Sequence, residues 1–164
     1  MLAVTSAGAI GSCMRNIKKL VAVSSAGGHW TQLQLLSEAF EHYNVLYVTT
    51  NMNMSAVDTH KDVIQVRDAD LSSKLKLVPL AIQIFAIMLR YRPDFIISTG
   101  AAPGFFAIVI GKLMGAKTIW VDSMANSSKL SVSGRHASRY CDLFLTQWPS
   151  LAQGDKVRYF GSLL

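Results

Sequence analysis

The sequence predicts a single α/β domain of the Rossmann-like type, in which a parallel sheet carries helices on both faces. Short apolar, β-branched runs alternate with longer stretches of helical periodicity, and glycine-containing turns follow two of these runs. Apolar residues make up 51% of the 164 residues, which is enough for one sizeable core. We expect residues 19–164 to form this domain. Residues 1–18 are expected to form a flexible or weakly membrane-associating tail.

The first half of the chain contains three expected strands and two expected helices. The strands are short apolar runs at residues 19–25, 44–50 and 63–66. A helix is expected between the first two runs, because apolar residues recur there at spacings of three and four. These residues are Trp30, Leu33, Leu36, Phe40 and Tyr43. The second helix is expected over residues 71–91, where Pro79 should introduce a kink or a break near the first turns.

The second half of the chain continues the same alternation. Strands are expected at residues 95–98, 117–121 and 143–145. An apolar helix is expected over residues 105–114 and should stop at Gly115, and a shorter helix is expected near residues 136–140. Regular alternation of strands and helices is typical of a parallel sheet.

Three polar turns should meet where ligands bind in such sheets, at the carboxyl ends of the strands. They span residues 24–29 (SSAGGH), 98–104 (STGAAPG) and 122–126 (DSMAN). Glycine lets a backbone approach a ligand closely, and a helix that follows points its first amides at the same place, which favours a phosphate. A single glycine turn is explained equally well by tight packing of a strand against a helix. Candidate binding residues are Ser25, Gly27, Gly28, Thr99, Gly100, Asp122 and Ser123.

Two side chains in these turns have chemistry that the sequence leaves open. His29 can act as a general base near neutral pH, orient a diphosphate, or only satisfy a backbone carbonyl. Asp122 can accept a hydrogen bond from a sugar hydroxyl or cap the loop that follows it.

Several ligand classes are disfavoured by the motifs. The Gly-x-Gly-x-x-Gly fingerprint is missing, and the run at 44–50 ends in Thr49, Thr50 and Asn51 without an acidic residue for a ribose. No Walker motif is present, and the two cysteines lack metal-site spacing, so we expect neither a cofactor nor a metal. Nucleic acid is disfavoured because the basic residues are scattered and do not interleave with aromatic residues.

The segment from Lys74 to Arg92 is unusually apolar between charged ends. Only Gln83 interrupts the apolar run from Leu77 to Leu89, which is too short for a span of about 20 residues. A core helix is one interpretation. The other is a helix face that docks on an anionic membrane, in keeping with the net charge of +6. The flanking cations are Lys74, Lys76, Arg90 and Arg92.

Four motifs in a fixed order carry a family resemblance: residues 24–29, 98–100, 120–123 (WVDS) and 147–149 (QWP). Over residues 19–164 the chain resembles the acceptor subunit of the two-part N-acetylglucosamine transferase of asparagine-linked glycosylation. It resembles equally the PssD-like proteins of bacterial capsule and exopolysaccharide biosynthesis. The resemblance implies the N-terminal half of a GT-B fold, similar to the first domain of MurG-like transferases.

The resemblance also implies a function. This half binds a polyprenyl-diphosphate-linked sugar acceptor at the cytoplasmic face of a membrane, while a separate partner chain binds the UDP-sugar. Transfer proceeds with inversion and without a metal. Gly27, Gly28 and His29 fall on the first glycine loop of the family, with His29 as the residue that activates the acceptor. Thr99 and Gly100 fall on the second loop.

Asp122 and Ser123 then fall on the loop that completes the acceptor site of the family. The eukaryotic subunit usually carries an N-terminal membrane helix, for which residues 1–14 are too weakly apolar, so the bacterial branch and a peripheral membrane association fit better.

A non-catalytic membrane adaptor that recruits a transferase is the first alternative to this function. The second is a stand-alone nucleotide-cofactor enzyme. The identity of the sugars is left open.

Overall fold

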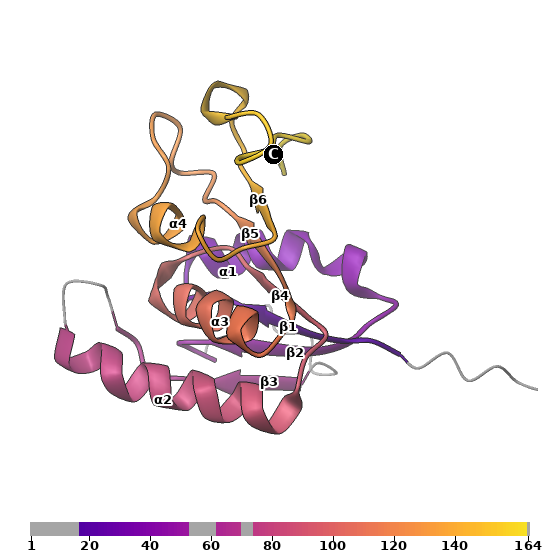
Figure 1. Ribbon diagram of the computed structural model, residues 1–164, viewed down its shortest axis with the longest axis vertical. Coiled ribbons are helices and arrows are strands. Elements are labelled where there is room, and N and C mark those ends of the chain that lie inside the picture. The colour runs from indigo at the N-terminus through magenta and orange to yellow at the C-terminus, as the bar shows by residue number, and fades with distance from the viewer. Residues whose placement is uncertain (1–16, 53–61, 70–73, 164) are drawn as a thin grey trace, which may run out of the picture.

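The computed structural model describes residues 17–52, 62–69 and 74–163 and forms a six-stranded sheet in the order β3-β2-β1-β4-β5-β6 (Figure 1). Each pairing between neighbouring strands is parallel, which confirms the predicted Rossmann-like class. The strands are β1 Lys19–Val23, β2 Asn44–Thr49, β3 Asp62–Gln65, β4 Phe95–Ser98, β5 Lys117–Val121 and β6 Leu143–Leu145. The predicted tail lies almost entirely outside the described residues.

The helices follow the predicted order, with differences at their ends. They are α1 Gly28–Leu35, α2 Lys74–Tyr91, α3 Ala101–Leu113 and α4 Val132–Ala137, with 3₁₀ turns η1 Ser37–Phe40 and η2 Pro149–Leu151. The single helix expected through Tyr43 instead ends at Leu35, where the amide of Leu36 donates to the carbonyl of Leu33 and tightens the chain into η1. α2 runs through Pro79 without a break.

Two predicted helix starts were wrong for local reasons. α3 begins four residues earlier than expected, because Pro103 lies in its first turn, where a missing N–H costs nothing. α4 begins at Val132, since the Ser131 side chain caps it by accepting from the amide of Gly134 at 2.9 Å. The expected stop at Gly115 is confirmed by its positive φ of 87°.

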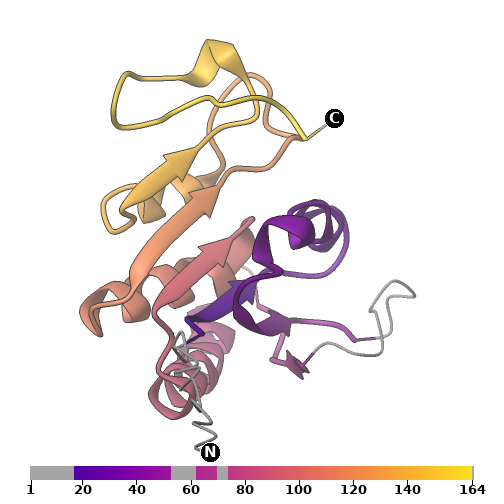
Figure 2. The ribbon, with the colours of Figure 1, turned by 90° about the vertical axis from the view of Figure 1, so that its right-hand side faces the viewer.

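Helices cover both faces of the sheet, as predicted (Figure 2). Successive residues of a strand point to opposite faces, so β1 divides its side chains between two clusters. Val21 and Val23 pack in the larger cluster with residues of α2, α3 and α4. Leu20 and Ala22 pack in the smaller one with residues of α1 and η1.

Two ion pairs close loops at the amino ends of the strands. Lys18, just before β1, contacts Asp94, just before β4, at 2.8 Å. Lys112, near the end of α3, contacts Asp142, just before β6, at 2.5 Å. We call this side of the sheet the amino edge and the opposite side, where the strands end, the carboxyl edge.

Candidate functional site

The three polar turns lie next to one another at the carboxyl edge, because the strands that precede them are neighbours. Val23 at the end of β1 is in register with Ser98 of β4, and Ser98 is in register with Trp120 of β5. The sheet order therefore brings together the turns β1–α1, β4–α3 and β5–α4, as the sequence predicts. All seven candidate binding residues and His29 lie in these turns or at their borders.

His29 is joined to the neighbouring turn by two reciprocal hydrogen bonds. Its ring nitrogen Nδ1 lies 2.8 Å from the carbonyl oxygen of Thr99, and the hydroxyl of Thr99 donates to the carbonyl oxygen of His29 at 2.7 Å. A carbonyl oxygen can only accept, so Nδ1 carries the proton and Nε2 carries the lone pair in the neutral ring. The half-buried imidazole is thereby held with a basic nitrogen at Nε2.

Gly100 lies directly against the imidazole ring. A Cβ atom at this position would lie 2.5 Å from Cε1 and 2.6 Å from Nδ1 of His29, which no real side chain tolerates. Its φ of 142° is also a conformation that L residues rarely adopt. Gly100 thus provides a flat backbone surface for the ring.

The first glycine turn leaves the N-terminus of α1 without a side-chain cap. Gly27 precedes the helix with a φ of 78°, and the exposed Gly28 is its first residue. Ala26 fixes the loop to the residue that follows β2, because its amide donates to the hydroxyl of Thr50 at 3.0 Å. Ser25 is half-buried beside it. The first amides of a helix lack acceptors within the helix, so this end offers donors to an anion.

The Asp122 carboxylate is hydrogen-bonded to other residues of the protein. It is 1% exposed, and its carboxylate accepts from the indole of Trp120 at 3.1 Å and from the amide and hydroxyl of Ser131 at 2.9 and 2.5 Å. This geometry matches the loop-capping role, one of the two that the sequence left open. Ser123 is nearly buried, and its hydroxyl accepts from the amide of Ala125 at 3.3 Å.

Gln32 on α1 belongs to the same assembly and was missed by sequence reasoning. Its amide nitrogen donates to the carbonyl of Asp122 at 2.9 Å, and its amide oxygen accepts from the amide of Met124 at 3.2 Å. The side chain is completely buried. The sequence carries no clear signal for it, because α1 also contains the polar residues Thr31 and Gln34.

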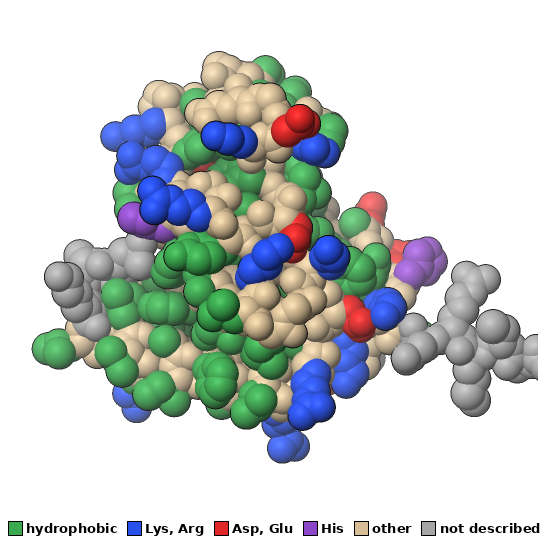
Figure 3. Space-filling model, viewed as in Figure 1, with side chains coloured by type: hydrophobic (Ala, Val, Ile, Leu, Met, Phe, Trp, Pro, Cys, Tyr) green, Lys and Arg blue, Asp and Glu red, His purple; other side chains and the backbone are tan. Residues whose placement is uncertain are grey.

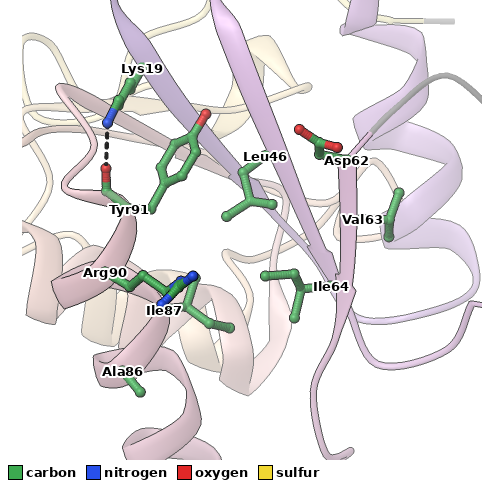
Figure 4. A pocket seen from close by; sticks show the side chains of 9 residues that line it. All are labelled: Lys19, Leu46, Asp62, Val63, Ile64, Ala86, Ile87, Arg90 and Tyr91. Carbon is green, nitrogen blue, oxygen red and sulfur yellow. Dashed lines mark hydrogen bonds between the residues drawn. The ribbon is translucent and has the colours of Figure 1, made fainter.

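The cations at the ends of α2 are separate from this site. Lys76, Arg90 and Arg92 are exposed, while Lys74 begins α2 and its side chain lies outside the described part of the structure. Arg90 also lines a pocket of about 550 Å³ between α2 and β3 (Figure 4). Lys19 closes one side of that pocket by donating to the carbonyl of Tyr91 at 3.1 Å. The pocket lies at the amino edge, away from His29.

Within residues 17–52, 62–69 and 74–163, no group of three or more His, Cys, Asp or Glu side chains could hold a metal ion. None of the helices in these ranges combines the length and apolar character needed to cross a membrane.

The fold is that of the N-terminal half of a GT-B glycosyltransferase. MurG of Acinetobacter baumannii superposes with a TM-score of 0.72 at 12% identity, over 87% of this chain and 45% of MurG. A UDP-N-acetylglucosamine 2-epimerase superposes with a TM-score of 0.65 at 10% identity, over 89% of this chain and 48% of the epimerase. The chain thus spans about half the length of these structures, and at such identities the likeness concerns the fold alone.

The family follows from the sequence itself. The family described as "Oligosaccharide biosynthesis protein Alg14 like" matches residues 40–163, and the chain belongs to this family. The UDP-N-acetylglucosamine transferase subunit ALG14 of Yarrowia lipolytica is 26% identical over 175 residues, covering 100% of this chain and 80% of the relative. The Candida albicans subunit of the same name is 33% identical over 103 residues, covering 56% of this chain and 47% of the relative. The resemblance stated from the motifs is confirmed.

Proposed function

We propose that this protein is the acceptor-binding and membrane-docking subunit of a two-part inverting glycosyltransferase. A separate donor-binding chain supplies a UDP-sugar, and the acceptor is a saccharide on a polyprenyl diphosphate. The observation that carries the proposal is the pairing of His29 with two glycine turns at the carboxyl edge. Family membership supports it, because curated relatives are named subunits of a UDP-N-acetylglucosamine transferase.

The acceptor diphosphate is proposed to bind at the N-terminus of α1. Gly27 and Gly28 leave this end free of side chains and without a side-chain cap, so a phosphate can approach the first amides closely. The helix dipole adds a favourable field for negative charge at this end. A diphosphate held there lies beside His29, the second residue of the same helix.

His29 is proposed to act as the general base. Nε2 takes the proton from the acceptor hydroxyl while the hydroxyl oxygen forms a bond to the anomeric carbon of the donor. The bond from that carbon to the UDP oxygen breaks on the opposite face, which inverts the configuration, and UDP leaves with the electron pair. The imidazolium that results still donates from Nδ1 to the Thr99 carbonyl, a charge-assisted hydrogen bond.

The outer face of α2 is proposed to dock on an anionic membrane. Leu80, Ile84 and Met88 form the buried stripe of this helix. A second apolar stripe faces outward at spacings of four, three and four, and its side chains are 50–62% exposed. We call it the outer stripe; its residues are Val78, Ile82, Phe85 and Leu89. A helix that is apolar on both sides needs an apolar partner on the second side as well.

Charges around the outer stripe fit negatively charged lipid headgroups. Figure 3 shows hydrophobic side chains gathered over α2 and α3, with Lys and Arg side chains over α4 and beside the end of α2. Leu113 and Met114 at the end of α3 are also exposed apolar residues. Exposed cations on α2 and α4, or directly after them, are Lys76, Arg90, Arg92, Arg135 and Arg139. Apolar residues can enter the acyl boundary while these cations contact headgroups.

The test is isolation of the chain from its native membranes in detergent, followed by mass spectrometry of what remains bound. We expect a donor-binding chain whose addition gives transfer from UDP-N-acetylglucosamine to a polyprenyl-diphosphate-linked sugar. His29→Ala should abolish transfer without loss of the partner, whereas His42→Ala, at an exposed position outside the three turns, should leave transfer unchanged. Normal turnover with His29→Ala would favour a non-catalytic membrane adaptor. Recovery without partner or membrane would contradict the proposal.

A further inference from the structure

We propose that Thr99 and Gly100 are positioning residues that hold His29 in the tautomer protonated at Nδ1. The catalytic consequence of this inference rests on the function proposed above, since only the other nitrogen, Nε2, can then accept a proton. The sequence assigned both residues to acceptor binding. Their contacts in the structure are instead directed at the histidine.

Thr99 is held in place by the sheet, independently of its contacts with His29. Its side chain is completely buried, and its amide donates to the carbonyl of Val23 in β1 at 3.4 Å. Its carbonyl and hydroxyl then take opposite roles towards His29, one accepting from the ring and the other donating to the backbone. The ring and the main chain of His29 are therefore both held by one residue that the sheet immobilises.

The Thr99 carbonyl selects between the two neutral tautomers. With the proton on Nε2, the lone pair of Nδ1 would face the carbonyl oxygen at 2.8 Å, and two acceptors would repel each other. With the proton on Nδ1, the contact is a hydrogen bond. Described residues make no hydrogen bond to Nε2, so it is left to accept a proton from a substrate.

Gly100 holds the ring by its lack of a side chain. A methyl group there would overlap Nδ1 and Cε1, so the ring would have to rotate away from the Thr99 carbonyl. The same substitution also strains the backbone, because φ is 142°. Gly115 provides a matched control: its φ is 87°, yet nothing lies within 4 Å of its ideal Cβ position.

The first experiment reads the tautomer directly and requires no enzymatic activity. The full chain, labelled with ¹⁵N at its histidine rings, is examined by NMR, and His29 is assigned by the signal lost in His29→Gln. We expect the proton of the neutral ring on Nδ1, with Nε2 at the shift of an unprotonated nitrogen. Gly100→Ala should shift these signals, whereas Gly115→Ala should not. A proton on Nε2, or equal shifts in the two variants, would overturn the proposal.

The second experiment links the positioning of His29 by the Thr99 hydroxyl to the rate of transfer. Thr99→Val keeps the carbonyl that accepts from Nδ1 but removes the hydroxyl bond that holds the main chain of His29. With the complete complex, it should lower kcat by roughly tenfold or more with little change in KM, because a displaced base loses much of the factor of about 10² to 10⁴ that general-base catalysis contributes. Thr99→Ser keeps the hydroxyl and should restore most of the rate. Equal rates for Thr99→Val and the wild type would refute the positioning role. If the wild-type complex transfers no sugar, the proposed function fails, while the NMR result still decides the tautomer.

Discussion

Membrane binding by the outer stripe can be tested with two isoleucines on one helix. Ile82 is 62% exposed and Ile84 is completely buried, because residues two positions apart in α2 point to opposite sides of the helix. Ile82→Ala removes three carbons worth about 0.8 kcal/mol each on full transfer from water. Scaled by the exposed fraction, the loss is about 1.5 kcal/mol, or roughly tenfold in affinity for vesicles that contain phosphatidylserine. Co-sedimentation of the protein with such vesicles measures this change.

Ile84→Ala is the matched control and should give the opposite pattern. It leaves a cavity between α2 and the sheet and should lower the free energy of unfolding by about 2–5 kcal/mol. The folded variant should still bind vesicles like the wild type. Ile82→Ala should unfold at the same urea concentration as the wild type or slightly above it, since alanine is the better helix former. Unchanged vesicle binding by Ile82→Ala would refute the proposed face.

Three further predictions concern stability and reactivity. Ser131→Ala should lower the free energy of unfolding by about 1 kcal/mol or more in urea titrations, because it removes the cap of α4 and a hydrogen bond to a buried carboxylate. The Lys18 ammonium and the backbone amide of Lys19 donate to Asp94 and lower its pKa, so its contribution to stability is present above about pH 4 and is lost as the pH falls through the lowered folded pKa. Asp94→Asn should therefore flatten the stability curve in that acid range, and a curve as steep as that of the wild type would contradict this assignment. Burial raises the pKa of Cys141 to about 11, so little of this thiol is in the reactive thiolate form at pH 8. In a Cys13→Ser background, a thiol reagent at pH 8 should therefore react slowly with the folded protein and rapidly after unfolding. Equal rates would contradict burial of the thiol.

Elements governed by short-range patterns could be predicted from the sequence. The bounds expected for β5 and β6 are those of the structure, because each is a short run rich in apolar or β-branched residues that stops before a polar residue. The start of α4 could not be predicted in the same way. It depends on Ser131 as a cap, and the cap is held by a carboxylate nine residues earlier in the chain.

The chemistry of the site depended on contacts too distant for the sequence to reveal. The tautomer of His29 is set by Thr99, a residue seventy positions away. Asp122 could be a ligand or a cap until its three hydrogen bonds to Trp120 and Ser131 were known. The apolar run of α2 suited either a core helix or a docking face, and the packing of α3 and the sheet against one side decided which residues stay exposed.

The two ion pairs lie at the amino edge of the sheet and the polar turns at its carboxyl edge, so stability and ligand contacts can depend on different parts of the domain. The ion pairs Lys18–Asp94 and Lys112–Asp142 join loops at the amino edge, whereas the imidazole of His29 lies at the carboxyl edge. Substitutions in these ion pairs can therefore change the melting temperature of the domain with little direct effect on the site. The amino edge can therefore be changed by design or by natural substitution while the polar turns at the carboxyl edge stay the same.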